Sequence, residues 1–218
     1  MTYAVKEIFY TLQGEGANAG RPAVFLRFSG CNLWTGLERD RLNGPGGCSQ
    51  WCDTDFVGTA GTGGGKFRNA NDLVAAVRAH WPSCIPNQVH AIPLCVCTGG
   101  EPLLQVDGAL LNAFESAGWC VAIETNGTLM PPPGKAWLTV SPKARSQLRI
   151  MQGNELKLVF PQVGAEPERF ENLAFQHFFL QPLDGPHIAT HTQEAVEYCL
   201  SHPLWRLSLQ THKILGIR

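Results

Sequence analysis

Three cysteines in the N-terminal part of the chain could hold a metal centre. Cys31 follows a strand-like stretch, and Cys48 and Cys52 lie in the glycine-rich segment after it. An iron–sulfur cubane held by three cysteines keeps one iron open for a small ligand, whereas a fourth cysteine would close it. Trp51, directly before Cys52, could shield such a cluster from water. These residues predict a redox cluster with an open iron.

The spacing of the thiols leaves zinc as an alternative. Sixteen residues separate Cys31 from Cys48 and three separate Cys48 from Cys52, and neither gap matches an ordinary zinc knuckle. A zinc site completed by a histidine, or three unconnected thiols, stays open on spacing alone. The remaining cysteines lie in apolar settings and are predicted to be buried core thiols; they are Cys84, Cys95, Cys97, Cys120 and Cys199.

A second motif runs from Thr98 to Pro102, after a strand-like stretch rich in cysteine and β-branched residues. Gly99 and Gly100 would let the backbone approach a ligand closely, and Glu101 would supply a negative charge suited to an ammonium group. A plain turn between a strand and a helix would have the same sequence. The motif therefore predicts a ligand site only when it is considered together with the cysteines.

Strand-like and helix-like segments alternate from Leu94 onward, which predicts an α/β fold of parallel strands joined by crossover helices. The expected strands are 23–28, 92–98, 119–125, 136–141, 155–160, 177–181 and 205–211. The expected helices are 71–80, a segment capped by Asp107, and 192–201. Thr190 and Gln193 are spaced as a capping box for the last helix, which should bury Ala195, Val196, Cys199 and Leu200.

Polar residues follow the C-terminal end of one expected strand after another. These clusters are 30–32, 98–101, 124–126, 141–143, 181–182 and 210–213. In a parallel sheet or barrel such ends meet at one rim, where α/β proteins bind their ligands. We expect the chemistry to lie there.

Composition narrows the class of protein. The chain has 218 residues, of which 44% are hydrophobic and 16% charged, and its formal net charge is -1. One domain over 1–218 is the default for this length. The charge balance predicts no general attraction to nucleic acid or membrane, so a small-molecule partner is expected. No apolar run is long enough to span a bilayer and no secretion signal is present, which favours a cytoplasmic protein with reduced thiols.

Together these motifs resemble a known family. The aromatic-Cys pair followed by Gly99-Gly100-Glu101-Pro102 is similar to the radical S-adenosylmethionine superfamily, whose usual pattern is C-x3-C-x-aromatic-C. Seven ordered motifs resemble those of 7-carboxy-7-deazaguanine synthases; they are Tyr10–Gly16, Phe25–Cys31, Cys52–Asp55, Thr98–Pro102, Glu124–Gly127, Ser141–Lys143 and Gln210–Lys213. The expanded cysteine spacing departs from the pattern, so 32–66 is interpreted as an insertion in the cluster-binding loop, and some members carry a comparable one.

The resemblance implies a fold and a reaction. The fold would be a partial, modified TIM-like barrel of about six parallel strands. The family converts 6-carboxy-5,6,7,8-tetrahydropterin to 7-carboxy-7-deazaguanine with loss of ammonia, on the path to queuosine and related 7-deazapurines. Its cofactors are a 4Fe-4S cluster, S-adenosylmethionine and Mg²⁺. S-adenosylmethionine chelates the open iron, and its reductive cleavage gives a 5′-deoxyadenosyl radical that takes a hydrogen atom from C6 of the substrate.

Matching motifs also imply residue roles. Cys31, Cys48 and Cys52 would hold the cluster, and the Thr54 hydroxyl would be a hard oxygen ligand for magnesium. Contacts to S-adenosylmethionine are expected from Asp53, Gly99, Gly100, Glu101, Ser141, Lys143 and Gln181. Contacts to the pterin are expected from Leu12, Gln13, Gly14, Glu15, Arg27, Thr98, Glu124 and His212.

Three of these roles have specific chemistry and ordinary alternatives. Glu124 could accept two N–H bonds from the aminopyrimidine edge of a pterin, and the Arg27 guanidinium could grip its carboxylate. A structural salt bridge between Arg27 and Glu15 would explain that arginine without a ligand. Lys143 suits a cofactor carboxylate, but a solvated lysine is the simpler interpretation.

The resemblance further implies a homodimer and an external flavodoxin-type reductant. Two other hypotheses stand beside it. A glycyl-radical-enzyme activase would use the same cofactors on a partner protein, but it would not need Glu124 and Arg27 to recognise a pterin. A zinc-stabilised binding module without catalysis would bind zinc tightly and take up no iron.

Overall fold

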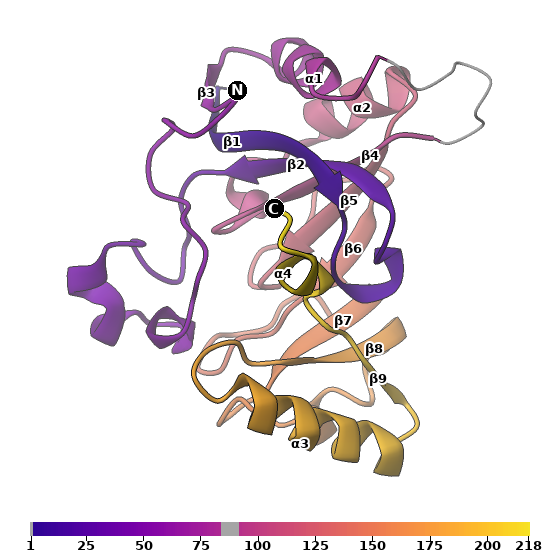
Figure 1. Ribbon diagram of the computed structural model, residues 1–218. Helices are drawn as coiled ribbons and strands as arrows, with labels where there is room; N and C mark the ends of the chain where they lie inside the picture. Colours follow the sequence, from indigo (N-terminus) through magenta and orange to yellow (C-terminus); the bar gives the residue numbers. More distant parts are fainter. Residues whose placement is uncertain (1, 84–91) are drawn as a thin grey trace.

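The computed structural model describes residues 2–83 and 92–218. Within these residues, nine strands form one open sheet in the order β3-β1-β2-β4-β5-β6-β7-β8-β9 (Figure 1). From β2 to β9 each strand runs parallel to its neighbour in the sheet, while β1 pairs antiparallel with β2 and β3. The α/β class with a parallel sheet is therefore confirmed. The sheet is not closed, because β3 and β9 are its edges.

The strands have the following bounds: β1 Tyr3–Leu12, β2 Pro22–Phe28, β3 Gly65–Phe67, β4 Leu94–Gly99, β5 Cys120–Thr125, β6 Trp137–Val140, β7 Gln152–Phe160, β8 Ala174–Pro182 and β9 Trp205–Leu207. The α-helices are α1 Ala70–Ala79, α2 Gly108–Ser116, α3 Ile188–Ser201 and α4 Thr211–Leu215. The 3-10 helices are η1 Gly16–Asn18, η2 Glu38–Asn43, η3 Cys48–Gln50, η4 Pro102–Leu104 and η5 Pro167–Arg169.

Local sequence explains where α1 and α2 begin. Asn69 caps α1 by accepting a hydrogen bond from the Asp72 backbone N–H, and Asp107 caps α2 by accepting one from Leu110 at 2.9 Å. Each helix buries one apolar stripe on the sheet, and the two helices pack against each other. They lie together near the end of the sheet that carries β1 and β3, whereas α3 covers β8 and β9 at the other end (Figure 1).

Side chains of the parallel strands alternate between two faces, and this alternation positions the site. On β4, Cys95 and Cys97 are fully buried in the main core, as predicted. Leu94 and Val96 point the other way, into a second apolar cluster. Because side chains repeat every second residue, Thr98 shares their face at the C-terminal end of the strand. The second face is thus apolar where β4 begins and polar where it ends.

Several expectations for the C-terminal region are wrong. The helix expected at 192–201 begins at Ile188 after the cap residue His187, so Thr190 lies inside α3 and forms no capping box. Leu200 is 81% exposed, because the inward stripe of α3 is centred on Ala195. The strand expected at 205–211 ends at Leu207, and 211 already starts α4.

Other differences concern connections. Strand β1 was not expected, although it is the longest of the N-terminal strands and lies between β2 and β3. The connections from β5 to β8 contain no α-helix in the described residues, so crossover helices do not follow every strand. The expected strand 92–98 starts at Leu94. Cys84 lies outside the described residues, and Cys120 and Cys199 are partly buried.

Among the residues that the structure describes, no helix is both long and apolar enough to cross a membrane.

The core predicts a large difference between two leucines. Leu156 on β7 is fully buried, whereas Leu200 on α3 is 81% exposed. We expect Leu156→Ala to lower the free energy of unfolding by about 2–5 kcal/mol, because it leaves a cavity in the core. Leu200→Ala should change it by less than about 0.5 kcal/mol. Chemical denaturation of both variants tests this, and equal losses would contradict the assigned burial.

Candidate active site

A cavity of about 470 Å³ lies at the C-terminal ends of the parallel strands. Its wall includes residues from all of β2, β4, β5, β6, β7 and β8, together with the loop that carries the cysteines. The predicted site residues line it, except for Gly14 and Glu101. The expected rim of polar strand ends is therefore brought together at one place, with a volume that suits small molecules.

Cys31, Cys48 and Cys52 all line this cavity. Cys48 opens η3, and the Cys52 backbone N–H donates to the Cys48 carbonyl at 2.8 Å, so one tight turn brings these two residues together. Burial raises the pKa of the Cys31 thiol, and it raises that of Cys48 to about 11 although the charge of Lys143 acts in the opposite direction. Three thiols thus share one wall with a cation.

The donor set fits an iron–sulfur cluster held by three cysteines. A cubane bonds each cysteine to a different iron, so its thiols must share a wall rather than surround one point. In the described part of the chain, no group of three or more His, Cys, Asp or Glu side chains is placed to bind a single metal ion. The Trp51 ring lines the same wall, with the Lys143 ammonium 5.4 Å from its centroid.

Gly99 and Gly100 are required by close packing beneath the cysteine loop. A Cβ on Gly99 would lie 2.3 Å from the Phe28 carbonyl, and its φ of 143° disfavours other residues. A Cβ on Gly100 would lie 2.7 Å from the Cβ of Cys31. Both glycines line the cavity, so the backbone that supports Cys31 also faces any ligand.

Glu101 lies behind the cavity wall rather than on it. Its fully buried carboxylate accepts hydrogen bonds from the backbone N–H of Leu103 at 2.9 Å and of Asn126 at 2.8 Å, and from the Thr125 hydroxyl at 2.7 Å. Burial raises its pKa despite these donors. The geometry makes Glu101 a brace between the ends of β4 and β5, and a direct contact with a cofactor amine stays a prediction.

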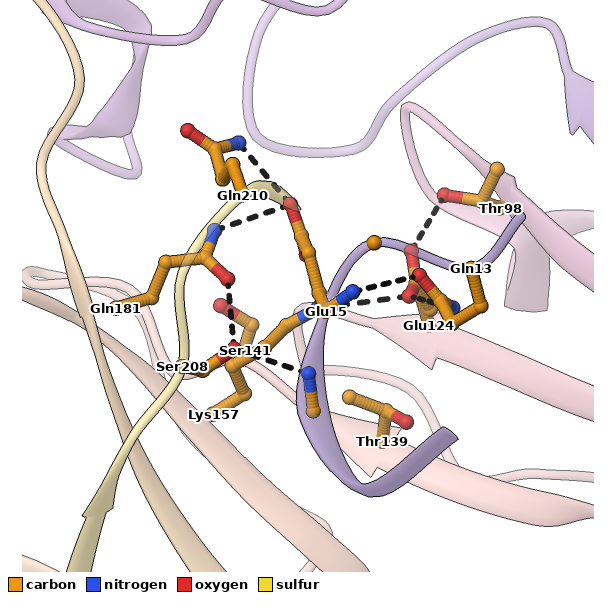
Figure 2. A network of polar contacts seen from close by, with 12 residues as sticks. Gln13, Glu15, Thr98, Glu124, Thr139, Ser141, Lys157, Gln181, Ser208 and Gln210 are labelled. Carbon is orange, nitrogen blue, oxygen red and sulfur yellow. Dashed lines mark hydrogen bonds and ion pairs between the residues drawn. The ribbon is translucent and has the colours of Figure 1, made fainter. Parts of the chain in front are cut away.

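Glu15 sits in the connection between β1 and β2 and is bound from three directions (Figure 2). It pairs with Lys157 of β7, and it accepts hydrogen bonds from the amides of Gln181 at 3.2 Å and Gln210 at 3.0 Å. Burial would raise its pKa, but the charge and hydrogen bond of Lys157 lower it to about 2. Glu15 is therefore an ionised acceptor at any ordinary pH.

Glu124 lies at the end of β5 on the same cavity wall (Figure 2). Its carboxylate accepts from the Gln13 amide at 3.1 Å and the Thr98 hydroxyl at 3.2 Å, and it lies 3.4 Å from the Lys157 ammonium. Lys157 thus bridges Glu15 and Glu124, which we call the carboxylate pair. Burial would lower the pKa of Lys157, but these carboxylates and Glu155 raise it.

Each member of the carboxylate pair keeps capacity for a ligand. A carboxylate has about four lone-pair sites. In the described residues, Glu15 and Glu124 each accept from three side chains. About one acceptor site therefore remains on each carboxylate, and together the pair can receive two N–H groups of a ligand in the cavity.

Arg27 pairs with Glu7 and not with Glu15, so the alternative of a structural Arg27–Glu15 salt bridge is wrong. Its Nε donates to Glu7 at 2.8 Å, while Arg218 binds the other oxygen of the same carboxylate. Glu15 is already paired with Lys157, which explains the difference. No described residue hydrogen-bonds the two terminal nitrogens of Arg27, so they can receive a carboxylate from the cavity.

The residues predicted to contact S-adenosylmethionine are placed differently from one another. Lys143 is not simply solvated: its ammonium lies 2.5 Å from the Ser141 hydroxyl, and burial lowers its pKa. Gln181 donates its amide N–H to Glu15, so it lies in the network around Glu15, and its predicted contact with S-adenosylmethionine stays a prediction. Asp53 pairs with Lys213 at 2.7 Å, although its carboxylate is largely exposed.

The remaining predicted residues surround the β1–β2 connection. Leu12 lines the cavity where β1 ends, and Thr54 lines it beside the cysteines. Gly14 packs against the His212 ring, since a Cβ there would lie 2.2 Å from its Nδ1. His212 itself lines the cavity from α4.

Sequence reasoning missed part of the wall. Lys157 was not singled out, although the strand expected at 155–160 alternates charged residues at 155 and 157 with leucines. This period-2 signal would have predicted a charged inward face. Phe25, Gln210 and Lys213 lie in motifs that the sequence singled out, although no role was assigned to them. The other unpredicted lining residues give no comparable signal; they include Glu7, Phe9 and Arg218.

Comparisons with known proteins show which family the chain belongs to. No family model matches the sequence. Proteins named 7-carboxy-7-deazaguanine synthase are similar over the full length of both chains: the one from Bordetella pertussis is 61% identical over 217 residues, and the one from Bradyrhizobium diazoefficiens is 55% identical over 218. That of Burkholderia multivorans is 53% identical over 217 residues, again over both whole chains.

A solved structure is also similar. The crystal structure of QueE from Escherichia coli matches with a TM-score of 0.69 and 28% sequence identity, and the match covers 96% of this chain and 94% of that one. The structural match thus covers nearly the whole chain, and the sequence matches cover its full length. This chain therefore belongs to the family of 7-carboxy-7-deazaguanine synthases, radical S-adenosylmethionine lyases of queuosine biosynthesis.

Proposed function

We propose that this chain converts 6-carboxy-5,6,7,8-tetrahydropterin to 7-carboxy-7-deazaguanine with loss of ammonia, on the path to queuosine and related 7-deazapurines. The observation that carries the proposal is the shared cavity, which brings three thiols and the carboxylate pair together. The thiols suit a cluster with an open iron, and the pair suits the N–H edge of an aminopyrimidinone. When bound, the cluster and S-adenosylmethionine supply a carbon radical that removes a hydrogen atom from the substrate.

The residues of the chain bind and orient the substrate. Glu15 and Glu124 accept its N–H groups with their remaining lone pairs. The free nitrogens of Arg27 receive its carboxylate as a fork. Two polar anchors at different points of the wall fix both position and rotation of the ring, which is what selective removal of one hydrogen atom requires.

Other residues serve the cofactors and keep water away. Cys31, Cys48 and Cys52 would hold the 4Fe-4S cluster. Lys143 and Ser141 lie beside the cysteines and are placed for the carboxylate of S-adenosylmethionine, with Asp53, Gly99 and Gly100 as further contacts. The stacked rings of Phe9 and Phe25, with centroids 5.3 Å apart, make an apolar part of the wall. A dry wall protects a reactive radical from side reactions.

Magnesium, dimerisation and the electron donor are further parts of the proposal. The Thr54 hydroxyl lines the cavity and would bind Mg²⁺ together with substrate oxygens and water. A homodimer and a flavodoxin-type reductant are expected from the family resemblance. The activase hypothesis is less well supported, because recognition of a polypeptide substrate does not require the two carboxylate acceptors and the Arg27 guanidinium in one cavity wall.

The direct test of the function is anaerobic incubation of the reconstituted protein with carboxytetrahydropterin, S-adenosylmethionine, Mg²⁺ and a reductant. We expect 7-carboxy-7-deazaguanine, identified by mass spectrometry, to accumulate over many turnovers. Formation of 5′-deoxyadenosine without this product would contradict the assigned substrate.

Cys48→Ala should abolish cluster binding, because it removes one of three ligands. Cys95→Ala removes another buried thiol, from the core face of β4, and should leave the cluster intact. Iron analysis and the visible absorption of reconstituted protein measure the difference. We expect about four irons per chain for the Cys95 variant and the parent. The reverse pattern would mean that other thiols hold the cluster, and zinc without iron would favour a binding module.

Glu124→Gln should raise KM for the pterin about 10-fold or more, because a charge-assisted hydrogen bond becomes a neutral one with an N–H facing the ligand. Cleavage of S-adenosylmethionine without substrate should be unchanged. Glu115→Gln on the exposed face of α2 is the control, since that carboxylate pairs only with Lys135 in the described residues. Normal turnover by the Glu124 variant would refute its role in substrate binding.

Thr54→Val should remove the stimulation of turnover by Mg²⁺, because the methyl group cannot coordinate the ion. Thr54→Ser keeps the hydroxyl and should keep the stimulation. Titration of activity with MgCl₂ after treatment with a chelator compares the two variants. If the valine variant responds to Mg²⁺ like the parent, another group binds the ion.

A further inference from the structure

Lys157 lies in the cavity wall and has no direct contact with substrate or cofactor in the proposed function. Its side chain is 7% exposed and points from β7 into the cavity wall. Its ammonium contacts Glu15 and lies 3.4 Å from Glu124, and Figure 2 shows it between the two acceptors. A buried lysine needs carboxylate partners. Here those partners are the residues proposed to recognise the substrate.

Charged groups reach this point from several elements. Glu15 comes from the β1–β2 connection, Glu124 from β5 and Glu155 from β7 itself. Lys143, after β6, also acts on Lys157 at longer range but is placed beside the cysteines. Three carboxylates therefore surround Lys157.

The other donors to the carboxylate pair are neutral. Gln181 and Gln210 bind Glu15, and Gln13 and Thr98 bind Glu124, while His212 acts on Glu15 at longer range. Neutral donors orient a carboxylate but compensate little of the repulsion between two negative charges. Among the ion pairs of the described residues, Lys157 is the cation common to both acceptors.

We propose that Lys157 is a positioning residue, which keeps Glu15 and Glu124 ionised side by side so that both act as acceptors for the N–H edge of the pterin. This inference rests on the proposed function, whose substrate carries that edge. Protonation would turn one carboxylate oxygen into an O–H donor and leave only a weaker, uncharged acceptor for an N–H group. Without Lys157, burial and like charge would together favour protonation of Glu15.

The consequence for stability can be worked out from Glu15. Its folded-state pKa of about 2 is below its ordinary value, so its ion pair contributes stability above about pH 4, and this contribution is lost as the pH falls toward 2. In Lys157→Met no ammonium group opposes the effect of burial, so burial raises the pKa of Glu15 above its ordinary value. The variant should then lose stability relative to the parent as the pH rises.

Enzyme kinetics test the substrate role. In reconstituted full-length protein, Lys157→Met should raise KM for carboxytetrahydropterin about 10-fold or more at pH 6.5. The ratio of its KM to that of the parent should fall at least about threefold by pH 8.5, as Glu15 ionises. Cleavage of S-adenosylmethionine without substrate should stay unchanged. Lys157→Arg keeps the charge and should give a ratio that does not vary with pH.

Lys135→Met is the matched control, since this exposed lysine pairs with Glu115 far from the cavity wall. A KM ratio that is constant with pH would mean that Lys157 only supports the fold and would overturn the proposal. So would equal behaviour of the methionine and arginine variants, or an unchanged KM in the methionine variant.

Unfolding measurements keep the proposal testable without turnover. The difference in Tm between the parent and Lys157→Met should grow as the pH rises from 5.5 to 8.5. The double variant E15Q/K157M lacks both charges, so its difference in Tm from the parent should stay nearly constant over this range. If the difference in Tm between the parent and Lys157→Met does not change with pH, the proposed effect of Lys157 on Glu15 is overturned, even if the enzyme forms product. If the parent forms no product while the pH-dependent difference in Tm is found, the proposed function fails and the substrate role of Lys157 fails with it.

Discussion

The ion pairs of Lys157 determine where the β1–β2 connection lies over the sheet. Buried charges are stable only with close partners, so Glu15 must stay at Lys157, and the connection that carries Glu15 must stay with it. Neighbouring contacts secure the same segment: the Gly16 backbone N–H donates to Ser208 at 2.9 Å, and that of Ala17 donates to Glu155 at 2.9 Å. A segment between two antiparallel strands thereby becomes a fixed wall of the cavity.

This wall needs the parallel register of the sheet. Because side chains repeat every second residue, the face that is apolar at Leu94 and Val96 ends in Thr98, and the face that holds Ala122 ends in Glu124. Adjacent parallel strands place these ends at one rim. The apolar cluster therefore supports the site from below, and the polar residues need not cross it. Hydrogen bonds such as that of Thr98 to Glu124 connect one strand end to the next.

The sequence predicts well which residues lie at the rim, but it predicts poorly which side chains pair with one another there. Polar strand ends, the cysteines and Glu124 follow from local patterns, and the structure places them in one cavity. Pairing is a tertiary property: the sequence does not tell which carboxylate Arg27 binds, and only the fold shows that it pairs with Glu7 while Lys157 pairs with Glu15. Leu200 shows the same limit in the core. Neighbouring residues of a helix point in different directions, so a small error in the position of the buried face turns an expected buried residue into an exposed one.

The long segment between Cys31 and Cys48 shows how cysteines with an expanded spacing can still line one cavity. Lengthening a loop costs little entropy, so the question is what directs its end. Arg41 of η2 donates to the carbonyls of Ser49 at 2.7 Å and Cys52 at 3.1 Å, while the Ser49 hydroxyl donates back to the Arg41 carbonyl at 2.5 Å. Its guanidinium also lies over the Trp34 ring, 5.0 Å from the centroid. The segment before Cys48 thus contains an arginine that binds the backbone of the cysteine turn itself. Since contacts with Arg41 hold that turn, the distance between the first two cysteines along the sequence can be long while all three cysteines still line the same cavity.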